Sequence, residues 1–330
     1  MANLTISTLC NLNCPYCFTR DHREGVVAGN GFVDLTSFTA WLNFLDRSQI
    51  DQVRLLGGEP TLHPQFTALV DLARARGKRV MVFSNGLIPE PALACLEQLP
   101  ATECAVLVNV NQPDLDGAQL HRRRCASIRR LGARALLGFN IYRTDFQPMF
   151  LLSVIAETAC QPIIRVGMAQ PCLSGRNQHI RPSQYRSIGV QIVRLAREAH
   201  DAGVVLEFDC GFVRCMFTEV ELKALKRLGT DVGWRCSPVL DIDVAGQVVH
   251  CYPLSRFMHL PLTPQVNAAS LRRAFVSHTQ PFRQVGVFKE CSTCPWKRSG
   301  ECSGGCLAVT MRRFRHMPFS VCVSQETIEG

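Results

Sequence analysis

The residues with the clearest chemistry are three cysteines near the N-terminus, Cys10, Cys14 and Cys17, spaced as C-x3-C-x2-C. Thiolates this close cannot all point at one centre from a regular strand or helix, but they can from a loop wrapped around a metal cluster. Iron–sulfur clusters normally have four cysteine ligands, so three would leave one iron open for a substrate or cofactor. A zinc site usually needs four protein ligands, and no fourth lies nearby. The spacing therefore favours a reactive iron–sulfur cluster.

Length and composition favour a metal-binding globular protein over a secreted or membrane protein. The chain has 330 residues, 47% of them hydrophobic, which is enough for one large domain and a smaller one. It shows no apolar run long enough to span a membrane and no signal peptide at its start. For its 17 cysteines we therefore expect metal clusters in a reducing cytoplasm rather than disulfides, with Cys95, Cys104, Cys125, Cys160 and Cys172 as small buried residues.

The net charge of +9 is concentrated in three arginine-rich stretches, residues 122–124, 129–130 and 312–315. Such stretches can contact nucleic acid or an acidic substrate. No recognisable nucleic-acid-binding module accompanies them. We expect a solvated face, or neighbours that offset the negative charge of the clusters, and no nucleic-acid partner.

The first two hundred residues alternate short apolar runs with helical stretches, which indicates a parallel sheet built from βα units. The expected strands cover residues 4–8, 52–56, 79–84, 105–110, 135–141 and 163–168. The expected helices cover residues 35–45, 65–76, 91–99, 118–131, 147–158 and 183–202. Six repeats are fewer than the eight of a closed barrel. The pattern therefore predicts an α/β fold, an incomplete (β/α)6 TIM-like barrel.

Active-site loops of such barrels follow the carboxyl ends of the strands, and glycines or polar residues stand at several of these ends. After the second expected strand comes Gly57-Gly58-Glu59-Pro60. Its glycines let the backbone approach a ligand closely, and the glutamate and backbone groups can hold an ammonium. Alone, this tetrapeptide is equally compatible with an ordinary turn. Later strand ends carry Ser84, Asn109 and Asn140.

With these motifs together, the first two hundred residues resemble the radical S-adenosylmethionine (SAM) superfamily. Cys10, Cys14 and Cys17 match its cluster-binding loop, and Tyr16 supplies the usual aromatic residue before the last cysteine. By the same resemblance, Gly57, Gly58, Glu59 and Pro60 would bind the methionine amino group. Contacts to the SAM carboxylate or ribose would come from Ser84, Asn109 and Asn140, and contacts to adenine from Val166 and Met168.

The resemblance implies a radical mechanism. SAM would chelate the open iron of a [4Fe–4S] cluster through its amino and carboxylate groups. One electron from an external reductant of the flavodoxin or ferredoxin type would cleave SAM into methionine and a 5′-deoxyadenosyl radical. That radical would abstract a hydrogen atom from the substrate. The cofactors carry the difficult chemistry, and the protein orients the substrate and excludes competing reactions.

Beyond about residue 205 the pattern changes to short strands, turns and cysteines, which divides the chain into residues 1–205 and 206–330. Two short strands flank a tight turn at Gly246, and this hairpin would bring Cys236 and Cys251 to one end. The cysteine order resembles the SPASM domain, an extension of radical SAM enzymes that carries two auxiliary iron–sulfur clusters. The gap between the fourth and fifth of its seven cysteines has seven residues here, where five are more usual.

The resemblance also implies two ligand sets. The first auxiliary cluster would use Cys236, Cys251 and Cys306, with Cys210 or Cys215 as the fourth ligand. The second would use Cys291, Cys294, Cys302 and Cys322. A zinc ribbon is the alternative, but it predicts a longer gap between two cysteine pairs. It also leaves the hairpin cysteines without a role.

The first auxiliary cluster needs only one of Cys210 and Cys215 as its fourth ligand, so the other cysteine is left without a cluster. A lone cysteine is most often a small structural residue, and this interpretation is favoured. The alternative is a catalytic thiol that donates a hydrogen atom to a substrate radical, as an epimerase would need.

Relatives with a SPASM domain mostly modify peptides or proteins. The leading hypothesis is therefore modification of a ribosomally made peptide by cross-linking, epimerisation or oxidation. Because the first cysteine is already at residue 10, we expect either a separate protein or the barrel alone to recognise the peptide. The main alternative is a radical dehydrogenase or epimerase of a small, aminoglycoside-like molecule. Two others are sulfatase maturation, disfavoured because Tyr252 replaces that branch's aspartate after the hairpin, and electron transfer or iron sensing.

Overall fold

The computed structural model describes residues 1–25 and 30–314, and its centre is a curved parallel sheet. Seven parallel strands follow one another in chain order across this sheet. They are β1 (Asn3–Ser7), β2 (Gln52–Gly57), β3 (Arg79–Ser84), β4 (Cys104–Asn109), β5 (Ala135–Ile141), β6 (Ile163–Met168) and β7 (Val205–Phe208).

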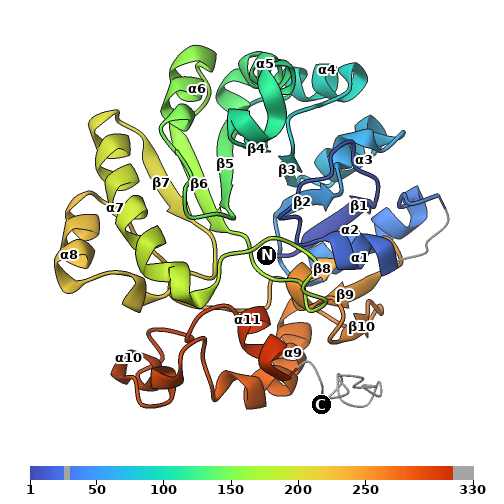
Figure 1. Cartoon of the computed structure of the whole chain (residues 1–330). Coiled ribbons are helices and arrows are strands. Elements are labelled where there is room, and N and C mark those ends of the chain that lie inside the picture. Colours follow the sequence, from blue (N-terminus) through green and yellow to red (C-terminus); the bar gives the residue numbers. More distant parts are fainter. Residues whose placement is uncertain (26–29, 315–330) are drawn as a thin grey trace.

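Helices connect these strands and cover the outer side of the sheet (Figure 1). They are α1 (Arg20–Gly25), α2 (Leu35–Arg47), α3 (Phe66–Ala75), α4 (Glu90–Gln98), α5 (Pro113–Leu131), α6 (Phe150–Thr158) and α7 (Tyr185–Asp201). Local sequence explains where helices begin: at α2 the Asp34 carboxylate accepts a hydrogen bond from the Ser37 backbone N–H at 2.8 Å, which satisfies a donor left free in the first turn.

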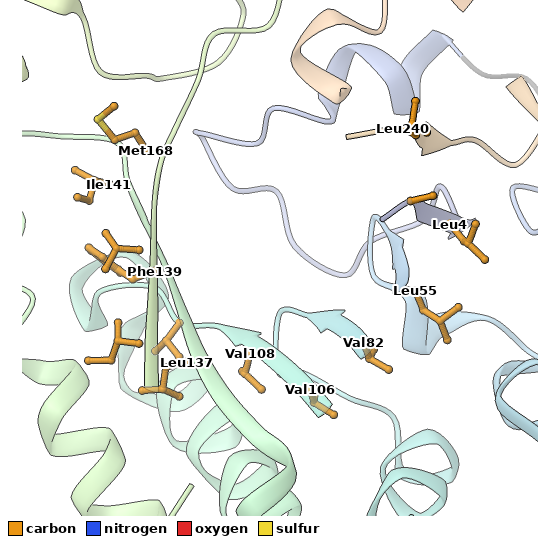
Figure 2. Packing of buried hydrophobic residues seen from close by; sticks show 14 of the residues in the cluster. Leu4, Leu55, Val82, Val106, Val108, Leu137, Phe139, Ile141, Met168 and Leu240 are labelled. Atoms are coloured by element: carbon orange, nitrogen blue, oxygen red, sulfur yellow. The ribbon is translucent and has the colours of Figure 1, made fainter. Parts of the chain in front are cut away.

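Alternation along the strands gives the sheet two different faces. Leu4, Leu55, Val82, Val106 and Leu137 come from five successive strands and lie in one buried cluster together with helix residues (Figure 2). Because successive strand side chains point to opposite faces, the residues between them face the inside of the curved sheet. Of the polar residues that the sequence placed at strand ends, Asn109 and Asn140 belong to this inner face, whereas Ser84 alternates in step with buried Val82.

The C-terminal region extends the same sheet. The strands β8 (Asp241–Ile242), β9 (Gln247–Val249) and β10 (His259–Pro261) continue it beyond β1, giving the order β10-β9-β8-β1-β2-β3-β4-β5-β6-β7. The described strands do not close into a barrel. The remaining helices are α8 (Glu219–Arg227), α9 (Ala268–Arg283), α10 (Pro295–Arg298) and α11 (Leu307–Met311). Figure 1 shows the orange and red C-terminal segments, including α9 and α11, between the two ends of the sheet.

The predicted α/β fold with an incomplete barrel is confirmed. All six predicted strands are present, with ends that differ by one residue at most. The pattern missed β7, which is only four residues long and half exposed. The predicted hairpin is also confirmed, since β8 pairs antiparallel with β9 and Gly246 has a φ of 74°. The boundary at residue 205 stays a prediction: strands from both sides of it belong to this one sheet.

Two further predictions, on membrane spans and on the arginine-rich stretches, can be compared with the described residues. No helix in residues 1–25 and 30–314 is long and apolar enough to cross a membrane. Of the arginines at residues 122–124 and 129–130, only Arg124 is buried; the other four are exposed, and Arg130 pairs at the surface with Glu90 and Glu97. Arg315 lies outside the described residues.

Candidate functional site

The three-cysteine loop follows β1 and borders a cavity of about 160 Å³. Cys10, Cys14 and Cys17 all line this cavity. Neighbouring strands contribute the other polar residues, because the carboxyl ends of parallel strands meet at one edge of the sheet. Five of the predicted SAM contacts line it as well, namely Gly57, Gly58, Ser84, Asn109 and Asn140.

Gly57 and Gly58 hold the cysteine loop against the end of β2. A Cβ atom on Gly57 would lie 2.2 Å from the Ser7 carbonyl oxygen, and one on Gly58 would lie 2.2 Å from the Leu9 carbonyl oxygen. The Gly58 N–H donates to the Ser7 carbonyl oxygen at 2.8 Å. Only glycine permits this close approach. These two positions therefore fix the loop as well as bordering the cavity.

Glu59 does not line the cavity, and its carboxylate ties two loops together. Its carboxylate is fully buried. It accepts hydrogen bonds from the Thr61 N–H at 3.2 Å, the Thr61 hydroxyl at 2.6 Å, the Ser84 hydroxyl at 3.0 Å and the Asn85 N–H at 2.7 Å. Burial raises the Glu59 pKa, and these donors oppose the rise. Pro60 is buried at the start of a short 3-10 helix (Pro60–Leu62). Among residues 57–60, only the two glycines border the cavity.

Two asparagines that sequence reasoning did not single out contact the cysteine sulfurs. The Asn85 side-chain amide lies 3.7 Å from Cys10 Sγ, and the Asn111 side-chain amide lies 3.9 Å from Cys14 Sγ. Amide donors of this kind stabilise negative charge on a thiolate and tune a bound cluster. Asn85 directly follows β3 and Asn111 lies two residues beyond the end of β4, and these positions were the available signal.

Tyr16 connects the cysteine loop to the end of β4. Its ring stacks on Tyr142 with centroids 4.8 Å apart, and its hydroxyl donates to the Asn111 side-chain oxygen. Asn111 donates in turn to the Asp116 carboxylate at 2.9 Å. Asp116 forms a buried ion pair with Arg124. These contacts form a continuous polar network that links the cysteine loop to the segment after β4 and to α5.

Val166 and Met168, the two residues predicted to contact adenine, differ in whether they border a cavity. Val166 is completely buried in the cluster between sheet and helices. Met168 is also buried, but it borders a second cavity that lies beyond the first. Only Met168 is therefore positioned beside open space.

The second cavity has a volume of about 350 Å³ and lies between the sheet and the C-terminal cysteines. Phe18, Asn109 and Asn140 border both cavities, so the two adjoin. Four cysteines line the second cavity, namely Cys210, Cys236, Cys251 and Cys306. Cys215 is not among the lining residues.

The four cysteines of the second cavity share one electrostatic environment. Burial raises the pKa of Cys251 well above its ordinary value, and the neighbouring Cys236 and Cys306 raise it further. The Cys306 pKa is raised to about 12, mainly by burial and then by Cys236. Cys210 touches the open space of the cavity, yet the surrounding protein also raises its pKa. Because metal ligands must be deprotonated, a bound metal would have to stabilise these thiolates.

A second group of cysteines lies around the 3-10 helix Arg214–Met216 and the segment before α11. Burial raises the pKa of Cys215 to about 11, and Cys291, Cys302 and Cys294 contribute to the rise. The guanidinium carbon of the adjacent Arg214 lies 3.8 Å from the ring centroid of Trp296, which follows Cys294 by two residues. Cys322, the fourth predicted ligand, lies outside the described residues.

The remaining cysteines behave as small packing residues. Cys104, Cys125, Cys160 and Cys172 are buried and Cys95 is partly buried. All cysteines in the described part of the chain are free of disulfides. Within the same part, no three His, Cys, Asp or Glu side chains are arranged to hold a single metal ion.

Comparison with known proteins supports the interpretation of the N-terminal region. Residues 4–134 match the model of the Radical SAM superfamily. A GTP 3′,8-cyclase of Klebsiella pneumoniae is 28% identical over 120 residues, 36% of this chain and 35% of the relative. An S-adenosylmethionine-dependent nucleotide dehydratase of a Thermoplasmatales archaeon is 33% identical over 97 residues, 29% of this chain and 33% of the relative. The matched segments thus span about a third of these relatives.

Solved structures share the fold over most of the chain. Native anSMEcpe with bound AdoMet has a TM-score of 0.66 at 17% identity, covering 92% of this chain and 88% of that one. Streptococcus suis SuiB bound to the precursor peptide SuiA has a TM-score of 0.64 at 13% identity, covering 93% and 71%. At these identities the similarity establishes the fold.

Proposed function

The chain is an enzyme of the radical SAM superfamily, and we propose that it modifies a ribosomally made peptide by cross-linking, epimerisation or oxidation. A single observation carries the proposal. The three-cysteine cavity adjoins a larger cavity that is walled by four further cysteines. A substrate residue in the larger cavity would lie between a radical source on one side and an auxiliary cluster on the other.

The residues of the first cavity suit a [4Fe–4S] cluster and SAM. Three thiols and two amide donors to sulfur form a donor set of the right chemistry, with no fourth cysteine lining the cavity. When bound, these cofactors supply a 5′-deoxyadenosyl radical that abstracts hydrogen atoms. Cys10, Cys14 and Cys17 would hold the cluster.

We assign the SAM contacts by position. The backbone of Gly57 and Gly58 would receive the amino group, because the Glu59 carboxylate is already satisfied by four protein donors. Asn109 and Asn140 would bind the carboxylate or ribose, with Ser84 in support, and Met168 would contact adenine.

We further propose two auxiliary clusters in residues 206–330. Cys210 would join Cys236, Cys251 and Cys306 at the first, since all four line one cavity. The second would use Cys291, Cys294, Cys302 and Cys322. Cys215 then remains as the extra thiol, and its place beside the second group rather than the cavity favours a structural role over hydrogen-atom donation.

We prefer a peptide as the substrate because of two proteins whose structures were solved with peptides. These are anSMEcpe with a Kp18Cys peptide and SuiB with SuiA, and their fold matches 92% and 93% of this chain, which includes most of the cysteine-rich region. A small molecule is the second candidate. The curated relatives are named for reactions of nucleotides, although their matches cover only 36% and 29% of this chain.

The partners follow from this chemistry. An external one-electron reductant would be required, and a separate protein would supply peptide recognition. The free cysteines of the described residues agree with a reducing compartment such as the cytoplasm.

The experiment is anaerobic reconstitution followed by two measurements. The first is iron content and formation of 5′-deoxyadenosine, with about twelve irons expected per chain from three four-iron clusters. Cys14→Ala should abolish cleavage, and Cys95→Ala should retain it. The second is mass spectrometry of a peptide encoded beside the gene after incubation with enzyme, SAM and reductant. An enzyme that cleaves SAM but leaves such peptides unchanged, while altering a nucleotide or aminosugar, would refute the peptide assignment.

A further inference from the structure

We propose that Arg54 and Arg165, at the floor of the larger cavity, bind an anionic group of the substrate, either a carboxylate or a phosphate. The inference rests on the proposed function, because it concerns the substrate of that same cavity. It adds a recognition element that does not depend on the clusters.

The two arginines come from opposite parts of the sheet and converge on one ring. Arg54 lies on β2 and Arg165 on β6, and both line the cavity. The two guanidinium carbons lie 6.0 and 5.8 Å from the centroid of the Phe83 ring on β3. Burial and the nearby Arg165 charge both lower the Arg54 pKa. Holding two like charges together costs free energy, which a bound anion would offset.

One carboxylate accompanies the two cations at this floor. Asp209 accepts from Arg165 Nε at 2.7 Å and from its Nη2. In the described part of the chain, the hydrogen bonds of Arg54 go to neutral acceptors, Gln52 Oε1 and Met1 Sδ, each at 2.9 Å. Arg165 is therefore paired with Asp209, whereas Arg54 forms no ion pair among the described residues.

Two glycines keep the space above the arginines open. A Cβ atom on Gly167 would lie 2.9 Å from Asn140 Oδ1, and one on Gly138 would lie 2.6 Å from Asn109 Oδ1. Both glycines face the inside of the sheet, in register with these asparagine-bearing strands. Gly167 lines the larger cavity, and a side chain there would meet Asn140, which borders both cavities. A substrate held by an anionic end at the floor can therefore extend toward the three-cysteine loop.

Apolar residues lie next to the arginines at the amino ends of the strands. Met81, Leu107 and Leu136 form a buried cluster against which Phe83 packs. Such surroundings exclude water and strengthen a charge-assisted contact. Guanidinium groups bind carboxylates and phosphates alike in a two-point geometry. A peptide would offer a carboxylate, whereas a nucleotide would offer a phosphate.

The test is calorimetric binding of two probes, glutarate and inorganic pyrophosphate, to the anaerobic cluster-loaded enzyme. Arg54→Gln and Arg165→Gln should each weaken the better probe about tenfold to a hundredfold, the usual range for losing a hydrogen bond to a charged group. The matched control is Arg130→Gln on the outer surface, which pairs with Glu90 and Glu97 and should bind like the wild type. Tighter binding of pyrophosphate identifies a phosphate-bearing substrate, and tighter binding of glutarate identifies a carboxylate.

Arg54→Lys guards against a folding defect, because it keeps the positive charge. Because lysine lacks the two-point geometry of the guanidinium group, this variant should bind the better probe less tightly than the wild type but more tightly than Arg54→Gln, with weaker binding at higher salt. Equal affinity in the wild type and Arg54→Gln would overturn the proposal, as would a loss in Arg54→Lys as large as in Arg54→Gln. Failure of the proposed function would show differently, as absent 5′-deoxyadenosine or an unmodified peptide, since probe binding needs no radical chemistry.

Discussion

The backbone N–H of Tyr252 donates to the buried carboxylate of Asp241 at 2.9 Å, in the wall of the larger cavity. The Asn3 amide donates to the other carboxylate oxygen at 2.6 Å. Despite these donors, burial raises the Asp241 pKa from 3.8 to about 7. The side chain therefore keeps its proton in the folded enzyme at pH values where the unfolded chain has lost it.

This shift predicts a pH-dependent stability. Between about pH 4 and pH 7 the folded chain binds the Asp241 proton and the unfolded chain does not, so stability should fall as pH rises through this window, by a few kcal/mol at most. Below this window Asp241 is protonated in both the folded and the unfolded chain. Above it Asp241 is ionised in both, and the full cost of burying its charge lowers the stability. Asp241→Asn should flatten the slope of the melting temperature against pH.

A constant difference in melting temperature between Asp241→Asn and the wild type does not test the raised pKa. An amide at 241 can accept from only one of its two donors, which lowers stability at every pH. The comparison is therefore the change from pH 5 to pH 7.5, measured by thermal unfolding of the cluster-loaded protein. Parallel curves for Asp241→Asn and the wild type would contradict the raised pKa.

The Asn85 amide should raise the reduction potential of the cluster held by the three-cysteine loop. It donates toward Cys10 Sγ at 3.7 Å and to Asn11 Oδ1 at 2.7 Å. Asn85→Ala removes a donor that stabilises the more negative, reduced state, so the potential should fall. Asn11→Ala is the control, because it removes the second contact and the Asn11 hydrogen bond to the Leu87 carbonyl oxygen but keeps the contact to sulfur. Redox titration followed by electron paramagnetic resonance measures both, and equal shifts would count against a role for the sulfur contact.

Cys210 and Cys215 should behave differently on substitution. Cys210 lines the larger cavity with Cys251, and Cys215 lies outside that lining. Cys210→Ala and Cys251→Ala should therefore alter the same auxiliary-cluster signal and lower the iron content. Cys215→Ala should leave that signal unchanged. Mössbauer and electron paramagnetic resonance spectra provide the test, and the reverse pattern would exchange the two assignments.

Gly58 should be essential for seating the cysteine loop. In Gly58→Ala the new Cβ would lie 2.2 Å from the Leu9 carbonyl oxygen and 2.9 Å from Cys10 Cβ. The loop must move, so the variant should lose the cluster bound there and about 1–3 kcal/mol of stability. Gly233→Ala is a suitable control, because nothing lies within 4 Å of its Cβ position. Iron content and thermal unfolding distinguish the two, and a cluster retained in Gly58→Ala would show that the loop has room to adjust.

Much of the framework was available from the sequence alone. Strands such as β3 and β5 were located exactly, because apolar alternation and helical spacing are local properties of the chain. The three-cysteine spacing predicted a loop at the end of β1 for the same reason. The short β7 was missed, because a four-residue exposed strand carries little periodic signal.

The tertiary structure decided which way the functional side chains face. Glu59 looked like a ligand for an ammonium, but its carboxylate turns inward to four protein donors, and Arg124 lies in a buried ion pair rather than on a solvated face. Arg54 and Arg165 are 111 positions apart, the difference between their residue numbers, and meet only because the sheet curves. Strand alternation fixes the face of each residue locally, but only the curvature of the whole sheet makes one face an interior. For that reason the sequence identified the cysteines, and only the fold showed the cavity that lies between them.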